Sequence, residues 1–425
     1  MKETTSKSQP VTKVMVWNAY QKVKANGGSA GIDGISIAKF DEDLPGNLYK
    51  LWNRLASGSY FPPPVKRVEI PKAGGKLRTL GIPTVADRIA QMVVKDHLEP
   101  KIEPHFHQNS FGYRPGRSAH MALAQARTNC WKMKWVIDLD IQSFFDELDH
   151  ELLMKALQRH TGEKWVLMYV ERWLKAPMAT VKGGEMARDK GTPQGGVISP
   201  LLANLFLHYT FDLWMQIHFP LLPFERYADD LVVHCRTKAE AYEVFAKIEA
   251  RLNACKLRAH PDKTRIVYCK NSDCKDAHSE IAFDFLGFTF RPRRCRRRDT
   301  GKLFLGYTPA ASRKSMKKMN QKIREMELHR ATGHTLKELA DLLNPSLRGW
   351  LAYFTKFTPS ALSGLLFQLN KRLVKWVRKK YKRFRHSEKK ALRWLAKLAD
   401  RFPKLFAHWE SGFKPTAMIR MRRAV

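Results

Sequence analysis

With 425 residues and an apolar share of 44%, the chain is long enough for two to four globular domains. No apolar stretch is long enough to span a membrane, and the first residues lack the apolar core of a signal peptide, so we expect a cytosolic protein. The six cysteines form no CxxC pair, which argues against a zinc ribbon or a disulfide framework and fits a reducing compartment.

The net charge of +36 is unevenly distributed along the chain. Residues 291–425 hold 36 Lys and Arg against 8 Asp and Glu, a surplus of 28. We therefore expect a polyanionic partner that binds mainly to this C-terminal third. A membrane surface is the alternative. Nucleic acid is favoured over a membrane because Trp, Tyr and Phe, which can stack on bases, are interspersed among the basic residues, and because no lipid-anchor signal is present.

The N-terminal part of the chain predicts helices on either side of a strand pair. Residues 12–26 have a helical pattern and are followed by the turn NGGSAGIDG. The segment FPPPVKRVEIPKAGGKLRTLGIP predicts two strands around a turn at Gly74 and Gly75. Helical patterns follow from Val85 to about Leu98 and from Leu148 to His160.

The middle of the chain predicts strands. In KWVIDLDI, apolar side chains occupy one face, while Asp138 and Asp140 share the other face with Val136. This segment is therefore a strand that carries carboxylates on one side. Later strand-like segments are Leu231–Cys235, Arg265–Cys269 and the apolar block Phe283–Phe290.

The composition changes at Arg291, where RPRRCRRRDTGK predicts a basic, exposed connection. Helices are expected beyond it. One apolar seam recurs at spacings of three, four and three: Met316, Met319, Ile323 and Met326. A second helical run, from Ala361 to about His386, begins apolar and ends strongly basic. We therefore expect a domain boundary at the basic connection.

Two adjacent carboxylates, Asp229 and Asp230, precede an apolar strand in FERYADDLVVHC. Two adjacent carboxylates repel each other, and partial burial adds a desolvation cost. A divalent cation bound between them would offset both costs. A two-metal polymerase site needs carboxylates from two strands, and Asp140 in DLDIQSFFDELDH is the candidate for the second strand. Mg²⁺ suits such a site because it takes hard oxygen ligands and completes its shell with substrate phosphates. Taken alone, YADD is more often a solvated hairpin turn.

Together and in this order, the two segments resemble those of reverse transcriptases, and among them the bacterial group II intron reverse transcriptase/maturases. The resemblance implies an α+β right-hand polymerase, with fingers and an antiparallel palm sheet followed by an α-helical thumb. It identifies Asp140 rather than Asp138 as the first catalytic aspartate, because Phe145 follows five positions later. Asp229 would bind metal directly, Asp230 would be a second or supporting ligand, and the cofactor would be two Mg²⁺ ions.

The resemblance implies five nucleotide contacts: Lys72, Arg78, Phe145, Gln194 and Lys263. The cations Lys72 and Arg78 would hold the triphosphate, with Lys76 as a competitor for either role. Gln194 lies in GTPQGGVISPLLANLF, whose glycines allow close backbone approach. Phe145 would pack under the sugar and favour deoxynucleotides, whereas Phe144 is an ordinary core residue. Lys263, in HPDKTRIVY, would lie near the triphosphate and could donate a proton to the leaving pyrophosphate.

The resemblance also implies contacts to RNA and primer. Template contacts are expected from GGSAGIDGIS and SFGYRPGRSAHMAL, at Gly31, Asp33, Arg114 and Arg117. Leu286 and Gly287 of FDFLGFTF would form the primer grip. LNPSLRGWLAYF resembles the maturase-specific thumb, with further RNA contacts at Arg348, Lys371, Arg372, Lys375 and Arg378. We expect the thumb aromatics Trp350, Tyr353 and Phe354 in the core, whereas Trp376, Tyr381 and Phe384 either stack on bases or anchor their helix.

The expected domains are an N-terminal extension (1–60), fingers and palm (61–290), and a basic linker with a helical thumb/maturase domain (291–425). The expected function is an RNA-dependent DNA polymerase that extends a DNA primer on an RNA template with dNTPs, and that binds structured group II intron RNA, assists splicing and supports retromobility. We expect it in the bacterial cytosol, associated with the nucleoid when on target DNA. Many family members carry a further HNH endonuclease region with paired cysteines. Because this sequence has none, we expect no target cleavage.

Two alternatives remain open from the sequence. A host-adopted reverse transcriptase in DNA repair or defence would keep the same polymerase site without an intron. An RNA-binding splicing factor without polymerase activity would tolerate loss of the carboxylates, and the presence of all three argues against it.

Overall fold

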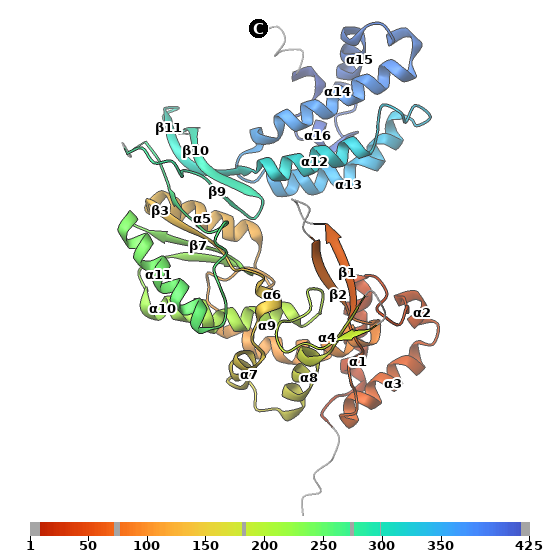
Figure 1. Cartoon of the computed structure of the whole chain (residues 1–425). Helices are drawn as coiled ribbons and strands as arrows, with labels where there is room; N and C mark the ends of the chain where they lie inside the picture. The colour runs from red at the N-terminus through yellow and green to blue at the C-terminus, as the bar shows by residue number, and fades with distance from the viewer. Residues whose placement is uncertain (1–8, 72–76, 181–183, 273–275, 298, 418–425) are drawn as a thin grey trace, which may run out of the picture. The chain divides into compact units, whose positions relative to one another are not determined.

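The computed structural model describes residues 9–71, 77–180, 184–272, 276–297 and 299–417, and Figure 1 gives the order of their helices and strands. The chain divides into two compact units. The first unit contains Met1–Ala122 and Ile137–Ile266, and the second contains Leu123–Val136 and Val267–Val425. This division lies upstream of the boundary expected at Arg291, and it assigns a short central segment to the second unit.

The first unit begins with helices whose ends are set by side-chain caps. The two segments predicted as helical form α1 (Lys13–Asn26) and α4 (Val85–Ile102), and these helices pack together. The hydroxyls of Thr12 and Thr84 accept hydrogen bonds from backbone N–H groups in the first turns of these helices, which satisfies donors that a helix end leaves free. The shorter helices nearby are α2 (Ile37–Asp41) and α3 (Leu44–Ser57).

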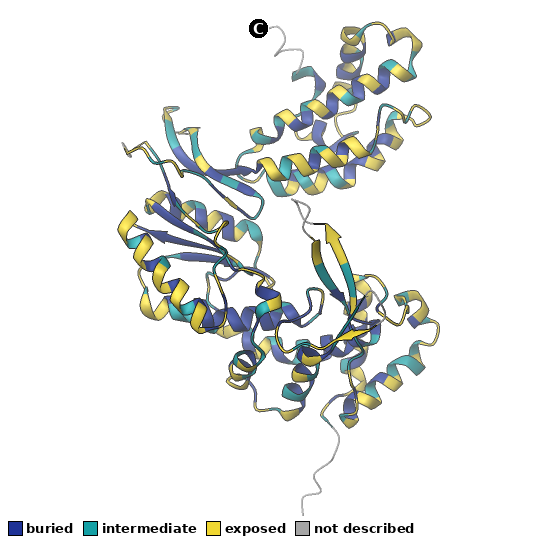
Figure 2. Cartoon of the chain, viewed as in Figure 1, coloured by how far each residue is buried: buried dark blue, intermediate teal, exposed yellow. Residues whose placement is uncertain are grey.

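A two-stranded hairpin follows, as the sequence predicts. Strand β1 (Lys66–Pro71) pairs antiparallel with β2 (Leu77–Ile82), and Pro71 lies opposite Leu77. Figure 2 shows that much of this hairpin is exposed. The predicted turn at Gly74 and Gly75 lies outside the described residues, as do Lys72 and Lys76.

The four-stranded sheet of the chain has the order β6-β7-β3-β8. All three strands predicted around the carboxylates are present, and the boundary between the two units passes through β3 and β8. Burial on both faces explains why β7 is nearly all apolar after its first residue. The strands are β3 (Trp135–Asp140), β6 (Phe224–Tyr227), β7 (Asp230–Cys235) and β8 (Arg265–Tyr268).

The other elements between residues 103 and 254 are helices, turns and one short strand pair. They are η1 (Glu103–His105), α5 (Ala119–Lys132), α6 (Phe144–Glu147), α7 (His150–Gln158), α8 (Lys164–Lys175), the strand pair β4 (Met178–Ala179) and β5 (Glu185–Met186), α9 (Ser199–Leu207), the π-helical turn η2 (His208–Asp212), α10 (Leu213–His218) and α11 (Lys238–Ala254). The helix predicted at Leu148–His160 is therefore confirmed as α7.

The basic connection expected at residues 291–302 is wrong for its first half, because Arg291–Arg296 lie in a strand. Residues Phe288–Arg296 form strand β10, which pairs with β9 (Phe283–Phe285) on one side and with β11 (Leu303–Ala311) on the other. The rings of Phe283 and Phe290 stack with centroids 4.8 Å apart and anchor one end. From there the backbone ladder continues to Arg296 opposite Leu303, because strand pairing requires no apolar side chain on an exposed stretch.

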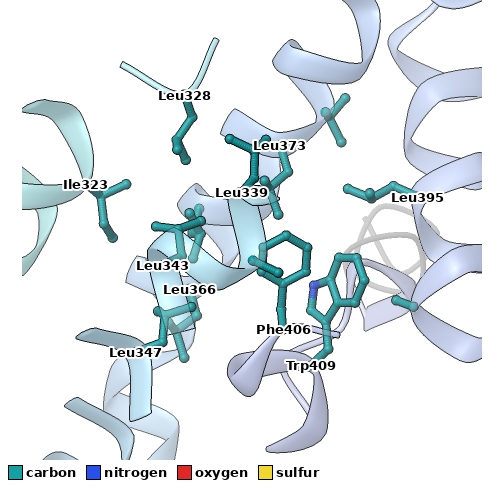
Figure 3. Packing of buried hydrophobic residues seen from close by; sticks show 14 of the residues in the cluster. Ile323, Leu328, Leu339, Leu343, Leu347, Leu366, Leu373, Leu395, Phe406 and Trp409 are labelled. Atoms are coloured by element: carbon teal, nitrogen blue, oxygen red, sulfur yellow. The ribbon is translucent and has the colours of Figure 1, made fainter. Parts of the chain in front are cut away.

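The remainder of the second unit is helical, as predicted. Its elements are α12 (Arg313–Glu325), α13 (Leu336–Phe354), η3 (Pro359–Leu362), α14 (Ser363–Lys380), η4 (Lys382–Phe384), α15 (Glu388–Arg401) and α16 (Ala407–Glu410). Figure 3 shows the core that these helices share, with Leu343, Leu373 and Phe406 directed toward one another. The predicted seam is confirmed: Met319 and Ile323 are buried in this core, and Met316 and Met326 pack against it.

Within the described part of the chain, no helix is both long enough and apolar enough to cross a membrane.

Candidate active site

The carboxylates Asp229 and Asp230 lie at a tight hairpin turn between β6 and β7. Tyr227 pairs with Asp230, so Ala228 and Asp229 form the loop. We call residues 227–230 the catalytic turn. Ala228 has a φ of 56°, in the left-handed region that a residue with a Cβ adopts only at an energetic cost. The surrounding structure must therefore hold this turn in place.

Asp140 ends strand β3, and a cation holds its carboxylate. The Nζ of Lys263 lies 2.7 Å from Oδ2 of Asp140, and the backbone N–H of His260 donates to the Asp140 carbonyl at 2.8 Å. Asp138, on the same strand face, pairs instead with Arg265 at 3.5 Å. The two aspartates of β3 therefore have different ion-pair partners.

The charge of Asp140 acts on the carboxylate of Asp229. The pKa of Asp229 is raised, first because the group is largely removed from water and then because the Asp140 carboxylate is close. Arg78 and Lys263 oppose this shift. Two carboxylates and two cations, contributed by the hairpin β1–β2, by β3, by the catalytic turn and by the segment before β8, thus meet at one place in the first unit.

A divalent cation fits the chemistry of this donor set. Among the described residues, no three side chains of His, Cys, Asp or Glu gather closely enough to hold a metal ion by themselves. A polymerase-type Mg²⁺ site does not require such a cage, because substrate phosphates and water complete the shell. The raised pKa of Asp229 shows a carboxylate whose charge its surroundings leave undercompensated, and carboxylate oxygens are the ligands that Mg²⁺ prefers.

A pocket of about 340 Å³ lies in the same unit and brings two predicted nucleotide contacts together. Phe145 and Gln194 both line it. The guanidinium Nε of Arg78 donates to Oε1 of Gln194 at 2.6 Å, although 116 positions separate the two residues. Phe145 is 8% exposed and its neighbour Phe144 is 2% exposed, so both rings are largely buried.

The glycines of the Pro-Gln-Gly loop allow strand β2 to approach. The backbone N–H of Gly81 donates to the Gln194 carbonyl at 3.1 Å. Gly195 has a φ of 131°, and a Cβ added to it would lie 2.6 Å from the carbonyl oxygen of Gly81. The close contact here is therefore with the protein's own strand. Gln91 of α4 supports the loop from below by accepting from the N–H of Val197 at 2.7 Å.

Tyr113 is a site residue that sequence reasoning missed. Its φ is 57°, its side chain is 56% exposed, and its ring centroid lies 6.5 Å from that of Tyr227. Its pKa is raised, first by partial burial and next by the charge of Asp229. The only local signal was an aromatic residue inside the GYRPG turn, where the neighbouring arginines are the more obvious candidates.

The expected template contact of Arg114 is contradicted. Its side chain is 5% exposed and forms an ion pair with Glu103 at 2.8 Å. Its Nη1 also donates to the carbonyls of His107 and Ser110 at 2.7 and 2.8 Å. These donors are used inside the protein, so Arg114 stabilises its loop and is no longer a candidate for phosphate binding.

The other expected template residues differ in their surroundings. Arg117 is partly exposed, with its guanidinium 5.7 Å from the ring centroid of Phe111. Gly31 is buried, and a Cβ there would lie 2.6 Å from Cα of Thr84 at the start of α4, so packing alone requires glycine. Asp33 is exposed and accepts a hydrogen bond from the N–H of Ile35 at 3.1 Å.

In the second unit, the expected primer grip is a hairpin turn tied to helices. Leu286 and Gly287 connect β9 and β10 with φ values of 50° and 79°. The Leu286 carbonyl accepts from the hydroxyl of Tyr353 at 2.9 Å, and the Gly287 carbonyl accepts from the hydroxyl of Ser315 at 3.0 Å. The turn is therefore fixed to both α12 and α13.

The thumb arginines and lysines are mostly available on the surface. Lys371, Lys375 and Arg348 are exposed, and Arg372 is partly exposed. Arg378 donates to the carbonyl of Arg385 at 3.0 Å.

The thumb aromatics belong largely to the helical packing. Trp376 is fully buried and donates to the Ala331 carbonyl at 2.8 Å, and Phe384 is buried too, so these two residues anchor the helices. Tyr381 is partly exposed and packs against the same core, as do Trp350 and Phe354.

Comparison with known protein families identifies the class of protein to which this chain belongs. Residues 70–290, just over half of the chain, match the family model for reverse transcriptase (RNA-dependent DNA polymerase). Residues 316–394 match the group II intron maturase-specific domain. Together with the fold, these matches define an RNA-directed DNA polymerase with an appended maturase domain.

The chain is also similar to individual proteins of several organisms. Protein YkfC of Escherichia coli (strain K12) is 34% identical over 304 residues, which is 63% of this chain and 77% of YkfC. The group II intron-encoded protein LtrA of Lactococcus lactis subsp. cremoris is 35% identical over 194 residues, 45% of this chain and 32% of LtrA. An uncharacterised 91 kDa protein in the cob intron of Schizosaccharomyces pombe is 34% identical over 45% of this chain and 23% of its own length.

The chain belongs to the reverse transcriptase family, and within it to the group II intron reverse transcriptase/maturases. The predicted family, fold class and enzyme class are confirmed. The matched segment spans only about a third of the length of LtrA.

Proposed function

We propose that the protein extends a DNA primer on an RNA template, with Asp140, Asp229 and Asp230 as the ligands of two Mg²⁺ ions. The observation that carries this proposal is that Asp229, in the turn leading into β7, lies close enough to Asp140, at the end of the adjacent strand β3, for the Asp140 charge to raise the pKa of Asp229. The Arg78–Gln194 hydrogen bond adds a cation at this place. When bound, the ions would neutralise the carboxylates and polarise the phosphate that is transferred.

The protein's own side chains would bind and orient the nucleotide. Arg78, already oriented by Gln194, carries a fixed positive charge that suits a triphosphate. Phe145 forms a rigid apolar wall of the pocket, which favours a sugar without a 2′-hydroxyl. Lys263 balances the charge of Asp140 before substrate arrives and can give a proton to the departing pyrophosphate.

We further propose that the helical part of the second unit binds structured intron RNA and assists splicing and retromobility. This rests on the maturase-specific domain at residues 316–394 and on the name of LtrA, a group II intron-encoded protein. The exposed cations of α14, among them Lys371 and Lys375, offer charges for phosphates. Splicing assistance requires RNA binding but not the aspartates.

Primer extension on an annealed RNA template tests the polymerase proposal. We expect Asp140→Asn and Asp229→Asn to lose at least about a hundredfold in rate, because each removes charge from the proposed metal site. The matched control is Asp138→Asn, on the same face of the same strand, which should stay within about threefold of the native protein. The proposal fails if Asp138→Asn and Asp140→Asn have equal effects, or if rNTPs are used as well as dNTPs.

A further inference from the structure

A buried arginine lies directly beneath the catalytic turn. Arg226, on β6, has no exposed surface, and neither does its partner Asp212. The guanidinium donates from Nε to Oδ1 of Asp212 at 2.7 Å and from Nη2 to Oδ2 at 2.6 Å. This two-point geometry fixes the plane and direction of the guanidinium group.

The remaining nitrogen of Arg226 reaches the catalytic turn itself. Nη1 donates to the carbonyl of Ala228 at 3.2 Å and to Oδ1 of Asn204 at 2.8 Å. Ala228 is the residue in the left-handed conformation, and its carbonyl belongs to the peptide bond that leads into Asp229. Arg226 therefore fixes the backbone group that sets where the Asp229 side chain begins.

The same network holds the turn from the other side. Nδ2 of Asn204 donates to the Gly112 carbonyl at 2.8 Å. A Cβ at Gly112 would lie 2.5 Å from the backbone nitrogen of Ala228, so only glycine allows this contact. The backbone N–H of Phe111 donates to the Arg226 carbonyl at 2.8 Å. The loop before α5 is thus fastened against the catalytic turn.

Asp212 owes its position to an irregular helix. Residues His208–Asp212 form a π-helical turn between α9 and α10, and Asp212 ends it. Such turns insert an extra residue and re-aim the side chains that follow, and they are frequent near functional sites. A fully buried ion pair is weak evidence for stability, because desolvation offsets much of the attraction. The direction in which this ion pair holds the Arg226 guanidinium, toward the Ala228 carbonyl, indicates a role other than stabilising the fold.

We propose that Arg226, oriented by Asp212, is a positioning residue that holds the catalytic turn so that Asp229 can take part in binding the Mg²⁺–dNTP complex. This inference rests on the proposed role of Asp229 as a metal ligand. Arg226 touches neither substrate nor metal. It acts through the carbonyl of Ala228 and would be required for nucleotide binding and for rate beyond its effect on folding.

The test uses the whole protein on an RNA template with a dideoxy-terminated DNA primer, which allows dNTP binding without turnover. The variants are Arg226→Lys, which keeps the charge but loses the planar fork, and Asp212→Asn, which keeps one acceptor oxygen. The matched control is Glu225→Gln. Glu225 forms a fully buried pair with His234 at 2.6 Å on the same two strands, but no turn residue takes part in that pair.

Three quantities are measured: the midpoint of thermal unfolding, the dNTP dissociation constant in the stalled complex, and the Mg²⁺ concentration that gives half-maximal binding. We expect all three variants to unfold at lower temperature. Arg226→Lys and Asp212→Asn should also raise the dNTP dissociation constant and the Mg²⁺ requirement at least about fivefold, while Glu225→Gln changes both by less than about twofold. If Arg226→Lys does not fold, Asp212→Asn decides by the same measurements.

The inference is overturned if both variants bind dNTP and Mg²⁺ as Glu225→Gln does. Asp229→Asn in the same assay separates this result from a failure of the proposed function. If Asp229→Asn binds the Mg²⁺–dNTP complex like the native protein, the metal-ligand role of Asp229 is wrong. If Asp229→Asn loses binding while the Arg226 and Asp212 variants keep it, only the positioning role is wrong.

Discussion

The Nζ of Lys263 lies 2.7 Å from Oδ2 of Asp140, so the carboxylate that we propose as a metal ligand and the lysine expected near the triphosphate form one ion pair. The two side chains, Lys263 and Asp140, are 57% and 27% exposed, and solvent screening makes the pair worth little for stability. We propose that the ion pair matters for the reaction, because the Lys263 ammonium would balance the charge of Asp140 before substrate binds and would donate a proton to the departing pyrophosphate.

Replacement of Lys263 should therefore affect rate more than stability. We expect Lys263→Met to reduce the single-turnover rate of dNTP addition by about a hundredfold, in the range known for general acids, with an unfolding midpoint close to the native value. Lys263→Arg should retain most of the electrostatic effect. Arg265→Met, which removes the ion pair with Asp138, is the control and should change the rate little. Equal rates for Lys263→Met and the native protein would rule out both proposed roles.

The close contact between the Pro-Gln-Gly loop and strand β2 gives a second prediction. Gly195→Ala would place a Cβ 2.6 Å from the Gly81 carbonyl at a φ of 131°, which forces the loop away from the strand. Because Gln194 and Arg78 meet across this junction, the Michaelis constant for dNTP should rise by about tenfold or more, as expected for strain of about 1–3 kcal/mol. Gly162→Ala meets nothing within 4 Å and is the matched control. An unchanged Michaelis constant for Gly195→Ala would show that this junction does not shape the nucleotide pocket.

Periodicity predicted the elements whose side chains recur on a buried face at the spacing of a helix or a strand. Strand β3, helix α7 and the seam of α12 follow alternations that are visible over a few residues. The basic part of β10, Arg291–Arg296, was missed because its ladder to β11 is made by backbone groups, which leave no trace in side-chain composition.

Contacts between residues far apart in the sequence could not be predicted from the sequence. The motifs located Asp140 and the catalytic turn, but not the Arg226–Asp212 pair beneath that turn, since no local pattern marks a buried charge whose partner arises from a π-helical turn. The contrast with Arg114 makes the same point. In the sequence, both are arginines beside an aromatic residue, and only the fold shows that Arg114 is taken up by Glu103.

The raised pKa of Asp87 predicts that the stability of the folded protein depends on pH. Asp87 is fully buried in α4 and accepts from Tyr60, Trp173 and Gln91, yet burial raises its pKa to about 6 from an ordinary 3.8. A raised folded-state pKa means that protonation favours folding. Its stabilising contribution is thus complete below about pH 3.8 and is lost as the pH rises through about 6, a difference of about 3 kcal/mol.

Denaturant unfolding at several pH values checks this prediction. The stability of the native protein minus that of Asp87→Asn should increase as the pH falls across this window. Asp87→Asn should also loosen Gln91, which supports Val197, and so weaken dNTP binding at neutral pH. A difference that does not vary with pH would mean that Asp87 keeps an ordinary pKa in the folded protein.

RNA binding by the second unit is tested by its dependence on salt. Lys371 and Lys375 lie one helical turn apart on the exposed face of α14, while Leu373, Val374 and Trp376 between and beside them are buried. Counterion release predicts that Lys371→Gln with Lys375→Gln reduces the slope of log affinity against log salt by about 0.7–0.9 for each RNA phosphate that these lysines neutralise. The control pair, Lys155→Gln with Lys175→Gln, removes two exposed lysines that already pair with Glu151 and Glu171 within their own helices. Equal slopes for the two double variants would mean that α14 contributes only general positive charge, whereas a smaller slope confined to the α14 pair would place RNA phosphates on this helix.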